Sequence, residues 1–406
     1  MSNTAALLKQ FIDEQPVFST HQHHLPRESQ QELTLDLIFK RSYVGWCSLP
    51  KGSSKEERQD WLQSIRLNAY FVWLEKVLKS TYGIDRITAN NWDAVSATIN
   101  KRHQNTNFHL DVLKEKGKYI GFMEDSYWDP GSDIGYPDFI TPVYRIDMWM
   151  QGFHPENPDH DGCNPHSFYG EMPTLDDYIN RLKEEITNRS DQIVGLKCAA
   201  AYERTIRFDE ASHAQAQAIF GKQPSEISTE EKKVFGDYIF HVVATLAEEL
   251  ALPIQIHTGL AQLEGSNPMN LESVIARFPR VQFVLFHGGF PWVYETAGLA
   301  HNYHNVILDI NWLPLISTTA AKQALNIYME VLRDNQRITW GADTWTSEEA
   351  VGASLAIRQI LTDVLTNKME EGYLDLNDAK NFAKKMLYRN AEKIYNLQLN
   401  NSAKTL

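Results

Sequence analysis

Two histidines separated by one residue, His21 and His23, end a short apolar run near the start of the chain. Residues i and i+2 of a β-strand point to the same side, so both imidazoles can reach one metal ion. His24 is expected to point to the other face of the strand or to begin the next loop. By itself the spacing is a weak indication, because such triplets arise easily.

Three further polar residues occur where other apolar runs end. They are His257, His287 and Asp343. Buried as isolated groups, imidazoles and a carboxylate each need partners that offset their desolvation, whereas a shared divalent cation satisfies them together. The pattern therefore indicates a metal site built from residues that are far apart in the sequence.

Eight short apolar runs, separated by helical patterns, predict βα units and a parallel sheet. The runs are residues 17–21, 119–123, 142–146, 193–198, 253–257, 281–287, 305–309 and 337–342. Eight alternating units indicate an α/β fold of the (β/α)8 TIM-barrel type. Catalytic groups of such barrels lie at the C-terminal ends of the strands, where the polar residues named above all fall.

The longest interval, between the first two runs, contains no convincing strand. A helix start at Ser54, an apolar face after it and a stop at Gly83 predict helices there. We expect residues 28–115 to form a helical insertion after strand 1, beside the barrel mouth. Residues 1–27 and 116–397 would then form the catalytic barrel, and residues 398–406 a polar tail.

Composition excludes several classes of function. The 406 residues include 39 basic and 52 acidic ones, a net charge of −13 without a basic block, so neither nucleic acid nor a membrane is expected as a partner. Three scattered cysteines encode neither a disulfide framework nor a thiolate zinc site. The start of the chain lacks a signal-peptide pattern. We expect a cytoplasmic protein, a homo-oligomer, that acts on a small molecule.

The set His21-x-His23, His257, His287 and Asp343, in this order along the barrel, resembles the amidohydrolase superfamily. Residues 12–397 resemble its amidohydrolase-2 branch of metal-dependent TIM-barrel hydrolases. The predicted insertion resembles those of the uronate isomerases and of FluG-like amidohydrolase domains. Ser19 departs from the family, which usually has an acidic residue two positions before the first metal histidine, so an additional carboxylate is not supported there.

This resemblance implies that His21, His23, His257 and Asp343 hold one divalent metal ion, most simply Zn²⁺. His287 would lie near the metal-bound water or the substrate oxygen. Such a metal lowers the pKa of its water toward about 7. Asp343 could then accept a proton from the water and pass it to the leaving group, while His287 polarises the scissile bond.

Lys197 ends the fourth run, and the resemblance gives it two alternative roles. In binuclear members of the superfamily a lysine on strand four is carbamylated and bridges two metal ions. Alternatively, Lys197 stays a cation and binds an anionic substrate. The residues that follow it, 199–204, resemble the FluG-like branch and favour the second role.

Two arginines and two tryptophans complete the candidate substrate-binding residues. Arg145 and Arg204 could clamp a substrate carboxylate in a bidentate fork, or form ordinary surface ion pairs. Trp292 and Trp345 follow strands six and eight, where their indoles could wall the pocket or simply pack.

The sequence thus favours a metal-dependent hydrolase of a C–N or related acyl bond in a small, carboxylate-bearing molecule. A uronate-isomerase-like sugar isomerase and a decarboxylase of the same branch are alternatives, and a non-catalytic ligand sensor is a third. By resemblance, His287 favours hydrolases and decarboxylases over isomerases. The intact set of metal-binding residues argues against a sensor.

Overall fold

All eight apolar runs contain strands in the computed structural model, which describes residues 3–26, 29 and 32–399. The strands are β1 (Val17–Gln22), β2 (Tyr119–Glu124), β3 (Ile140–Pro142), β4 (Tyr144–Arg145), β5 (Leu196–Cys198), β6 (Ile254–Ile256), β7 (Phe283–Leu285), β8 (Val306–Asp309) and β9 (Ile338–Thr339). Val143 alone separates β3 from β4, so the two together fill the third predicted position.

The strands pair in parallel within two sheets, β1-β2-β3 and β4 to β9 in sequence order. Backbone hydrogen bonds connect these sheets on both sides. The N–H of Val194 donates to the carbonyl of Pro142 at 3.2 Å, and the N–H of Asp343 donates to the carbonyl of His21 at 2.9 Å. The strands therefore close into the predicted (β/α)8 TIM barrel.

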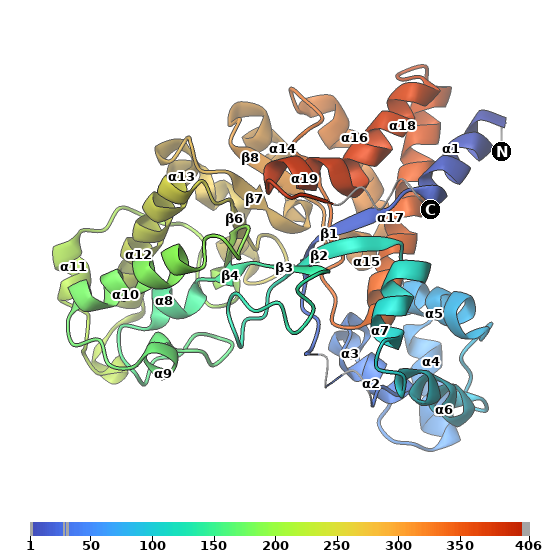
Figure 1. Cartoon of the computed structure of the whole chain (residues 1–406), viewed down its shortest axis with the longest axis horizontal. Coiled ribbons are helices and arrows are strands. Elements are labelled where there is room, and N and C mark those ends of the chain that lie inside the picture. Colours follow the sequence, from blue (N-terminus) through green and yellow to red (C-terminus); the bar gives the residue numbers. More distant parts are fainter. Residues whose placement is uncertain (1–2, 27–28, 30–31, 400–406) are drawn as a thin grey trace.

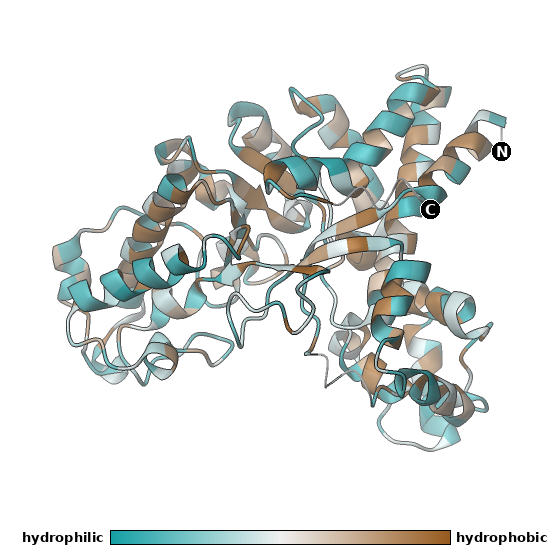
Figure 2. Ribbon diagram, viewed as in Figure 1, coloured by the Kyte–Doolittle hydropathy of each residue, from teal (hydrophilic) through white to brown (hydrophobic). Residues whose placement is uncertain are grey.

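Helices surround the barrel (Figure 1). They are α1 (Asn3–Glu14), α8 (Asp147–Gln151), α9 (Pro165–Tyr169), α10 (Leu175–Asn188), α11 (His213–Gln217), α12 (Thr229–Leu250), α13 (Glu272–Arg277), α14 (Val293–Asn302), α15 (Leu313–Ile316), α16 (Thr318–Val331), α17 (Ser347–Glu370), α18 (Leu376–Lys384) and α19 (Asn390–Ile394). The apolar residues of the strands and of the inward helix faces make up the main core (Figure 2).

The interval between β1 and β2 is helical, as predicted. It contains α2 (Leu35–Lys40), α3 (Tyr43–Cys47), α4 (Lys55–Ile65), α5 (Ala69–Tyr82), α6 (Trp92–His103) and α7 (Phe108–Asp111), followed by a π-helical turn over 112–116. These helices lie together on one side of the barrel (Figure 1). The first five, α2 to α6, share an apolar cluster around Phe39 and Trp92. Helix α5 packs against α17, which connects the insertion to the barrel.

Local sequence signals set the limits of the insertion helices. Ser54 and Glu57 form the capping box that begins α4, and Gly83 ends α5 in the left-handed region, at φ 72°. Between them the chain breaks into two helices, because the side chain of Asn68 accepts the N–H groups of Tyr70 and Phe71 and so begins α5.

The predicted domain boundaries stay predictions. Residues 27 and 28, at the first boundary, and residues 400–406 of the predicted tail lie outside the described residues. None of the described helices has the length and apolar composition that crossing a membrane requires.

Candidate metal centre and active site

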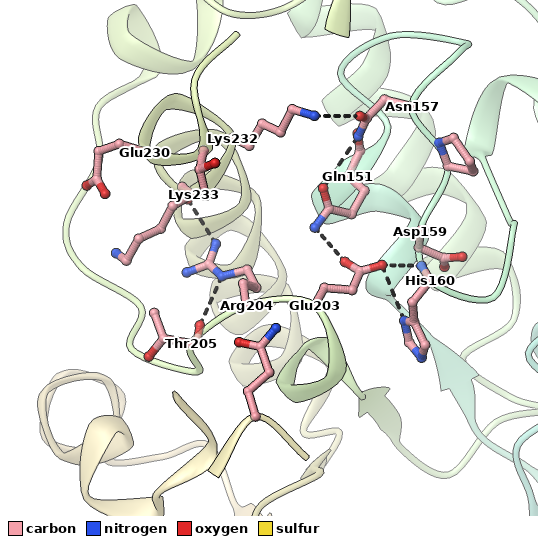
Figure 3. Close-up of a pocket in the computed structure, with 13 residues that line it drawn as sticks. Gln151, Asn157, Asp159, His160, Glu203, Arg204, Thr205, Glu230, Lys232 and Lys233 are labelled. Carbon is pink, nitrogen blue, oxygen red and sulfur yellow. Dashed lines mark hydrogen bonds and ion pairs between the residues drawn. The ribbon is translucent and has the colours of Figure 1, made fainter. Parts of the chain in front are cut away.

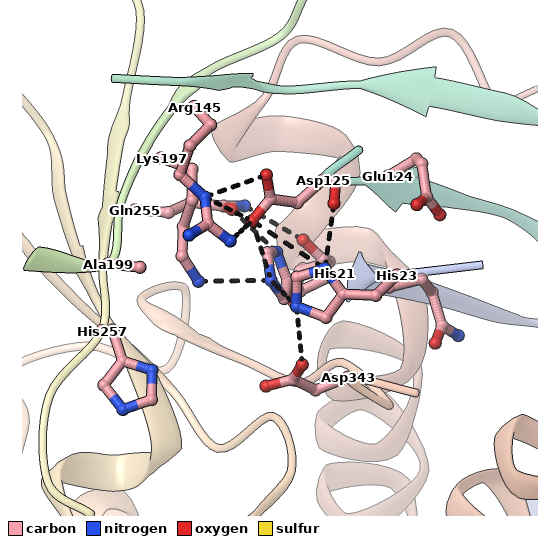
Figure 4. Close-up of polar contacts among 12 residues, drawn as sticks. His21, His23, Glu124, Asp125, Arg145, Lys197, Ala199, Gln255, His257 and Asp343 are labelled. Atoms are coloured by element: carbon pink, nitrogen blue, oxygen red, sulfur yellow. Dashed lines mark hydrogen bonds and ion pairs between the residues drawn. The ribbon is translucent and has the colours of Figure 1, made fainter. Parts of the chain in front are cut away.

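The ends of β1 and β9 bring three predicted metal ligands together. His21 lies on β1, His23 follows it, and Asp343 follows β9 on the neighbouring strand (Figure 4). One ligand atom from each residue lies within 4.8 Å of those of the other two, and all three residues are buried.

The hydrogen bonds of His21 direct a lone pair toward this group. Its Nδ1 lies 3.2 Å from Oε1 of Gln255, whose amide orientation is fixed because its NH₂ donates to the carbonyl of Thr20 at 3.0 Å. Since Gln255 Oε1 can only accept, Nδ1 of His21 carries the hydrogen and Nε2 has a lone pair, which also faces Nζ of Lys197 at 3.2 Å. Burial lowers the pKa of His21 well below its usual value, with Lys197 as the next cause, so the ring is neutral.

His23 is oriented in the same way. Its Nδ1 lies 2.9 Å from the carbonyl oxygen of Asp125, which leaves the lone pair on Nε2. The Nε2 atoms of His21 and His23 are 3.2 Å apart, and Oδ1 of Asp343 lies 3.3 Å from Nε2 of His23. Two lone pairs and a carboxylate that face one another repel unless a cation lies among them. Two imidazoles and one carboxylate therefore fit a divalent ion such as Zn²⁺.

His257 is not brought into this group, contrary to its predicted role as a fourth ligand. Its Nε2 lies 3.0 Å from the carbonyl of Leu260 in the turn after β6, and its Nδ1 lies 3.0 Å from Nε2 of His287. Both ring nitrogens thus face other partners, of which the local turn supplies one and His287 the other. Figure 4 shows His257 without a contact to His21, His23 or Asp343.

His287 lies beside the group, as its predicted position near the reacting atoms requires. Its Nδ1 is 3.2 Å from the carbonyl of Asn311 and 3.7 Å from Oδ2 of Asp343. Burial lowers the pKa of His287 to about 4, so its ring is neutral near pH 7. The carboxylate of Asp343 therefore lies between His23 on one side and His287 on the other.

The backbone after β7, β8 and β9 adopts an uncommon conformation. His287, Trp312 and Asp343 have φ values of 61°, 59° and 57°, in the left-handed region that few non-glycine residues occupy. Such residues cost roughly 1–3 kcal/mol each and persist only where the surroundings impose them. Three strand ends of one barrel face share this strain, which is typical of functional sites.

Lys197 lies next to the ligand group on β5. It is 2% exposed, and its Nζ lies 3.2 Å from Nε2 of His21 and 3.9 Å from the ring centroid of Phe286. Burial lowers the pKa of Lys197 to about 8. Its position is compatible with both predicted roles, as a bridge between metal ions or as a cation for a substrate.

Arg145 is engaged with carboxylates of the protein instead of facing an open pocket. Its Nε lies 3.0 Å from Oδ2 of Asp125 and its Nη1 lies 3.0 Å from Oδ2 of Asp161. Asp125 in turn orients His23 through its carbonyl, and its carboxylate lies 3.7 Å from Nε2 of His21. Arg145 thus supports the metal group from behind, where the sequence predicted a substrate clamp.

Arg204 lies at a different cavity. Its Nη2 pairs with Asp237, and its Nη1 and Nε donate to the carbonyls of Lys233 and Thr205 at 2.9 and 3.0 Å. It lines a cavity of about 560 Å³ beside the start of α12, together with Gln151, Asn157, Pro158, Asp159, His160, Glu203, Thr205, Thr229, Glu230, Lys232, Lys233 and Gln262 (Figure 3). His21, His23 and Asp343 are not among the residues that line it.

Aromatic rings cover the ligand group from two elements. Trp345 stacks on His23 with ring centroids 5.4 Å apart, and Trp312 lies edge-on to His287 at 5.0 Å. Tyr43 of the insertion contacts both indoles, at 4.8 and 4.6 Å. Trp345 therefore lies against the ligand group, and its role in lining a substrate pocket stays a prediction. Trp292 precedes α14, and among the described residues no ring contact connects it to this wall.

Gln255 and Asp125 are the functional candidates that sequence reasoning missed. Gln255 stands two residues before His257 within an apolar run, on the face that points into the barrel. Asp125 follows the second run by two residues, at a strand end like the predicted ligands. The alternation of side chains within a strand could have identified Gln255, and the position at a strand end could have identified Asp125.

Comparisons with known proteins agree with this architecture. Residues 223–397 match the model of the amidohydrolase family. Protein fluG of Emericella nidulans is 32% identical over 151 residues, which are 36% of this chain and 17% of fluG. The chain therefore matches only a small part of that longer relative.

Three crystal structures resemble nearly the whole chain. A uronate isomerase from Thermotoga maritima has a TM-score of 0.78 at 14% identity, covering 97% of this chain and 98% of that one. A glucuronate isomerase from Caulobacter crescentus has a TM-score of 0.70 at 16% identity, and the match covers 98% of this chain and 95% of that one. A metal-dependent hydrolase from Lactobacillus casei has a TM-score of 0.69 at 18% identity, and the match covers 96% of this chain and 97% of that one. At these identities the likeness shows the fold alone. The comparisons thus confirm the predicted resemblance to the amidohydrolase superfamily: the family model matches the C-terminal part of the chain, and the barrel fold extends over nearly all of it.

Proposed function

We propose that the protein is a metal-dependent hydrolase that cleaves a C–N or related acyl bond in a small molecule. The observation that carries this proposal is the meeting of the two Nε2 lone pairs of His21 and His23, 3.2 Å apart, beside the carboxylate of Asp343. This donor set fits one divalent ion and leaves room in its coordination shell, as catalytic zinc sites require.

A divalent metal held there supplies a Lewis acid and makes water a stronger acid, with a pKa near about 7. The side chains provide the rest of the chemistry. Burial would raise the pKa of Asp343, but its neighbours His23 and His21 oppose burial and hold that pKa well below its usual range. Asp343 is therefore a carboxylate that can accept a proton, and His287 orients its second oxygen.

We further propose that the substrate carries a carboxylate and that Lys197 binds it. Arg145 and Arg204 are both engaged with aspartates of the protein, so neither supports a substrate clamp. Lys197 is the cation that adjoins the metal ligands, 3.2 Å from His21. Trp345 and Tyr43 exclude water from the same side of the site.

A sugar isomerase is the second candidate, and a specific observation favours it. Three protein ligands, with His257 turned toward Leu260, leave more of a metal ion accessible than four would. An isomerase would use that space to orient a hydroxyl and a carbonyl oxygen of its substrate at once. Two of the structures that resemble the full chain are a uronate and a glucuronate isomerase.

The test combines the metal content of the purified protein with turnover of a panel of N-acyl amino acids, lactones and uronates. We expect about one divalent ion per chain and hydrolysis of an acyl substrate. Isomerisation of a uronate without any hydrolysis would select the second candidate. A protein that binds no metal after reconstitution would overturn both.

A further inference from the structure

The first turn of α17 joins three parts of the molecule: the strand end that carries Asp343, the helical insertion and the barrel wall. Two glutamates, Glu348 and Glu349, lie side by side in this turn and are 0% and 4% exposed. Buried carboxylates are rare unless they satisfy specific partners. Their partners differ, and the difference indicates separate roles.

Glu349 accepts two backbone N–H groups, one from the distant insertion and one from the loop that leads into its own helix. Its Oε1 accepts the N–H of Tyr43 at 2.8 Å, and its Oε2 accepts the N–H of Trp345 at 3.3 Å. Tyr43 is the first residue of α3, where a backbone N–H has no partner within its own helix. One carboxylate therefore connects the insertion to the segment just after the metal ligand Asp343.

The two residues that Glu349 connects form the aromatic wall of the site. The rings of Tyr43 and Trp345 meet edge-on with centroids 4.8 Å apart, and Trp345 stacks on His23. Tyr43 also stacks on Trp312 at 4.6 Å, and Trp46 of the same short helix contacts Trp345 at 5.6 Å. If the backbone of Tyr43 moves, the wall over the metal ligands moves with it.

We propose that Glu349 is a positioning residue that holds the aromatic wall of the insertion against the metal ligands and so sets the shape of substrate that the site accepts. The positioning itself is independent of the reaction, while its effect on substrate selection rests on the proposed function. The insertion is then part of the active site instead of an appended domain.

Glutamine at position 349 would break this arrangement without changing its size. A carboxylate offers acceptors to both N–H groups, whereas glutamine offers one acceptor oxygen and one NH₂ donor. One of the two N–H groups then faces another donor. Burial raises the pKa of Glu349 to about 8, against the two N–H groups that favour the carboxylate, so the unmodified protein and the variant are compared at pH values above about 9, where Glu349 is ionised.

Glu348 provides a matched control on the same helical turn. Its Oε1 lies 2.7 Å from Nε2 of His103 and 2.5 Å from the hydroxyl of Tyr82, both on the insertion and away from the aromatic wall. Glu348→Gln therefore loosens the contact between the insertion and α17 while it leaves the bonds to Tyr43 and Trp345 in place.

The experiment uses the full, metal-loaded chain labelled with 5-fluorotryptophan and followed by ¹⁹F NMR. Single Trp→Phe variants assign the resonances of Trp46 and Trp345. We expect Glu349→Gln to shift or broaden these two resonances and to raise KM on the order of tenfold, with a smaller change in kcat. Glu348→Gln should lower the thermal midpoint and leave both resonances and KM unchanged. Equal effects of the two variants, or none from Glu349→Gln, would overturn the proposal.

Hydrogen exchange of the unmodified protein covers the case in which Glu349→Gln does not fold. The amides of Tyr43 and Trp345 should exchange as slowly as those of the barrel strands, because Glu349 holds both. An amide of Tyr43 that exchanges at the rate of an exposed first helical turn would contradict the proposal. The NMR and exchange measurements need no substrate, so a protein without turnover would disprove the proposed function and leave this positioning role standing.

Discussion

Two pairs of strand-end histidines lie on the same face of the barrel, and only one of them forms a metal group. At β1, both Nδ1 atoms face fixed acceptors, so the Nε2 atoms of His21 and His23 meet at 3.2 Å with Asp343 as a third donor. At β6 and β7, His257 and His287 also approach to 3.0 Å, and their other ring nitrogens likewise face backbone carbonyls, those of Leu260 and Asn311. Lone pairs therefore face each other in that second pair as well, but among the described residues no carboxylate joins the two rings in a three-ligand group. The comparison teaches that a strand-end position makes a ligand possible and that a carboxylate within reach of both rings completes the donor set.

Alanine substitutions in the two pairs test this difference most directly. We expect His21→Ala to lose nearly all bound metal and to lower kcat/KM by at least about 10³-fold, because it removes one of three donors. His257→Ala should keep most of the metal, since its ring nitrogens face Leu260 and His287. The measurement is metal per chain after gel filtration.

An equal loss of metal in both variants would contradict the comparison. It would mean that the ring of His257 rotates onto the ion, and the four-ligand set that the family resemblance implies would then be correct. Two ions per chain in the unmodified protein would instead support a bridging Lys197.

Asp343 lies between the two histidine pairs, because one of its oxygens faces His23 and the other faces His287. We expect Asp343→Asn to lower kcat by about 10²- to 10⁴-fold, since an amide cannot accept a proton, while substrate affinity changes less. Steady-state kinetics on protein with verified metal content would show this. Near-normal turnover of the metal-loaded variant would remove the proton-accepting role and leave Asp343 as a ligand alone.

The barrel and most strand-end residues could be predicted because their signals are local. An apolar run of four to seven residues followed by a polar side chain indicates a buried strand and its end, as at His257 and Asp343. The aromatic wall was predicted in part, through Trp345. Its partner Tyr43 lies 302 positions earlier, and only the folded chain brings the two together.

The partners of each polar group could not be predicted, because they come from distant segments. Arg145 forms ion pairs with Asp125 and Asp161, and Arg204 forms one with Asp237 on α12. The sequence places both arginines near strand ends but contains no local sign of those carboxylates. The turn that brings the carbonyl of Leu260 to His257 could not be predicted from the sequence either.

Gln255 should affect metal binding by His21 and His23 only, because its side chain accepts the hydrogen bond from Nδ1 of His21. We expect Gln255→Met to weaken metal affinity about 10- to 100-fold, as the loss of a hydrogen bond behind a ligand commonly does. The matched control is Thr258→Val, just after the strand that carries Gln255. It removes a buried hydrogen bond from the Thr258 hydroxyl to the carbonyl of Phe286 and no bond to His21, His23 or Asp343. Competition with a chromogenic chelator measures the affinity. Equal affinities in the two variants would show that the orientation of His21 does not depend on Gln255.

The smallest effect is expected at Arg204, which lies outside both histidine pairs. Its guanidinium pairs with Asp237 and donates to two backbone carbonyls, at a cavity whose lining excludes the metal ligands. We expect Arg204→Met to leave kcat and KM within about twofold, and equally so for carboxylate and carboxamide versions of a substrate, since no interaction with the bound substrate is lost. Its cost should fall on stability, about 1–3 kcal/mol, because Asp237 loses a charged partner but keeps the bond from Lys233. A tenfold higher KM for the carboxylate version alone would mean that Arg204 does reach the substrate, and that the cavity beside α12 and the metal group form one continuous binding site.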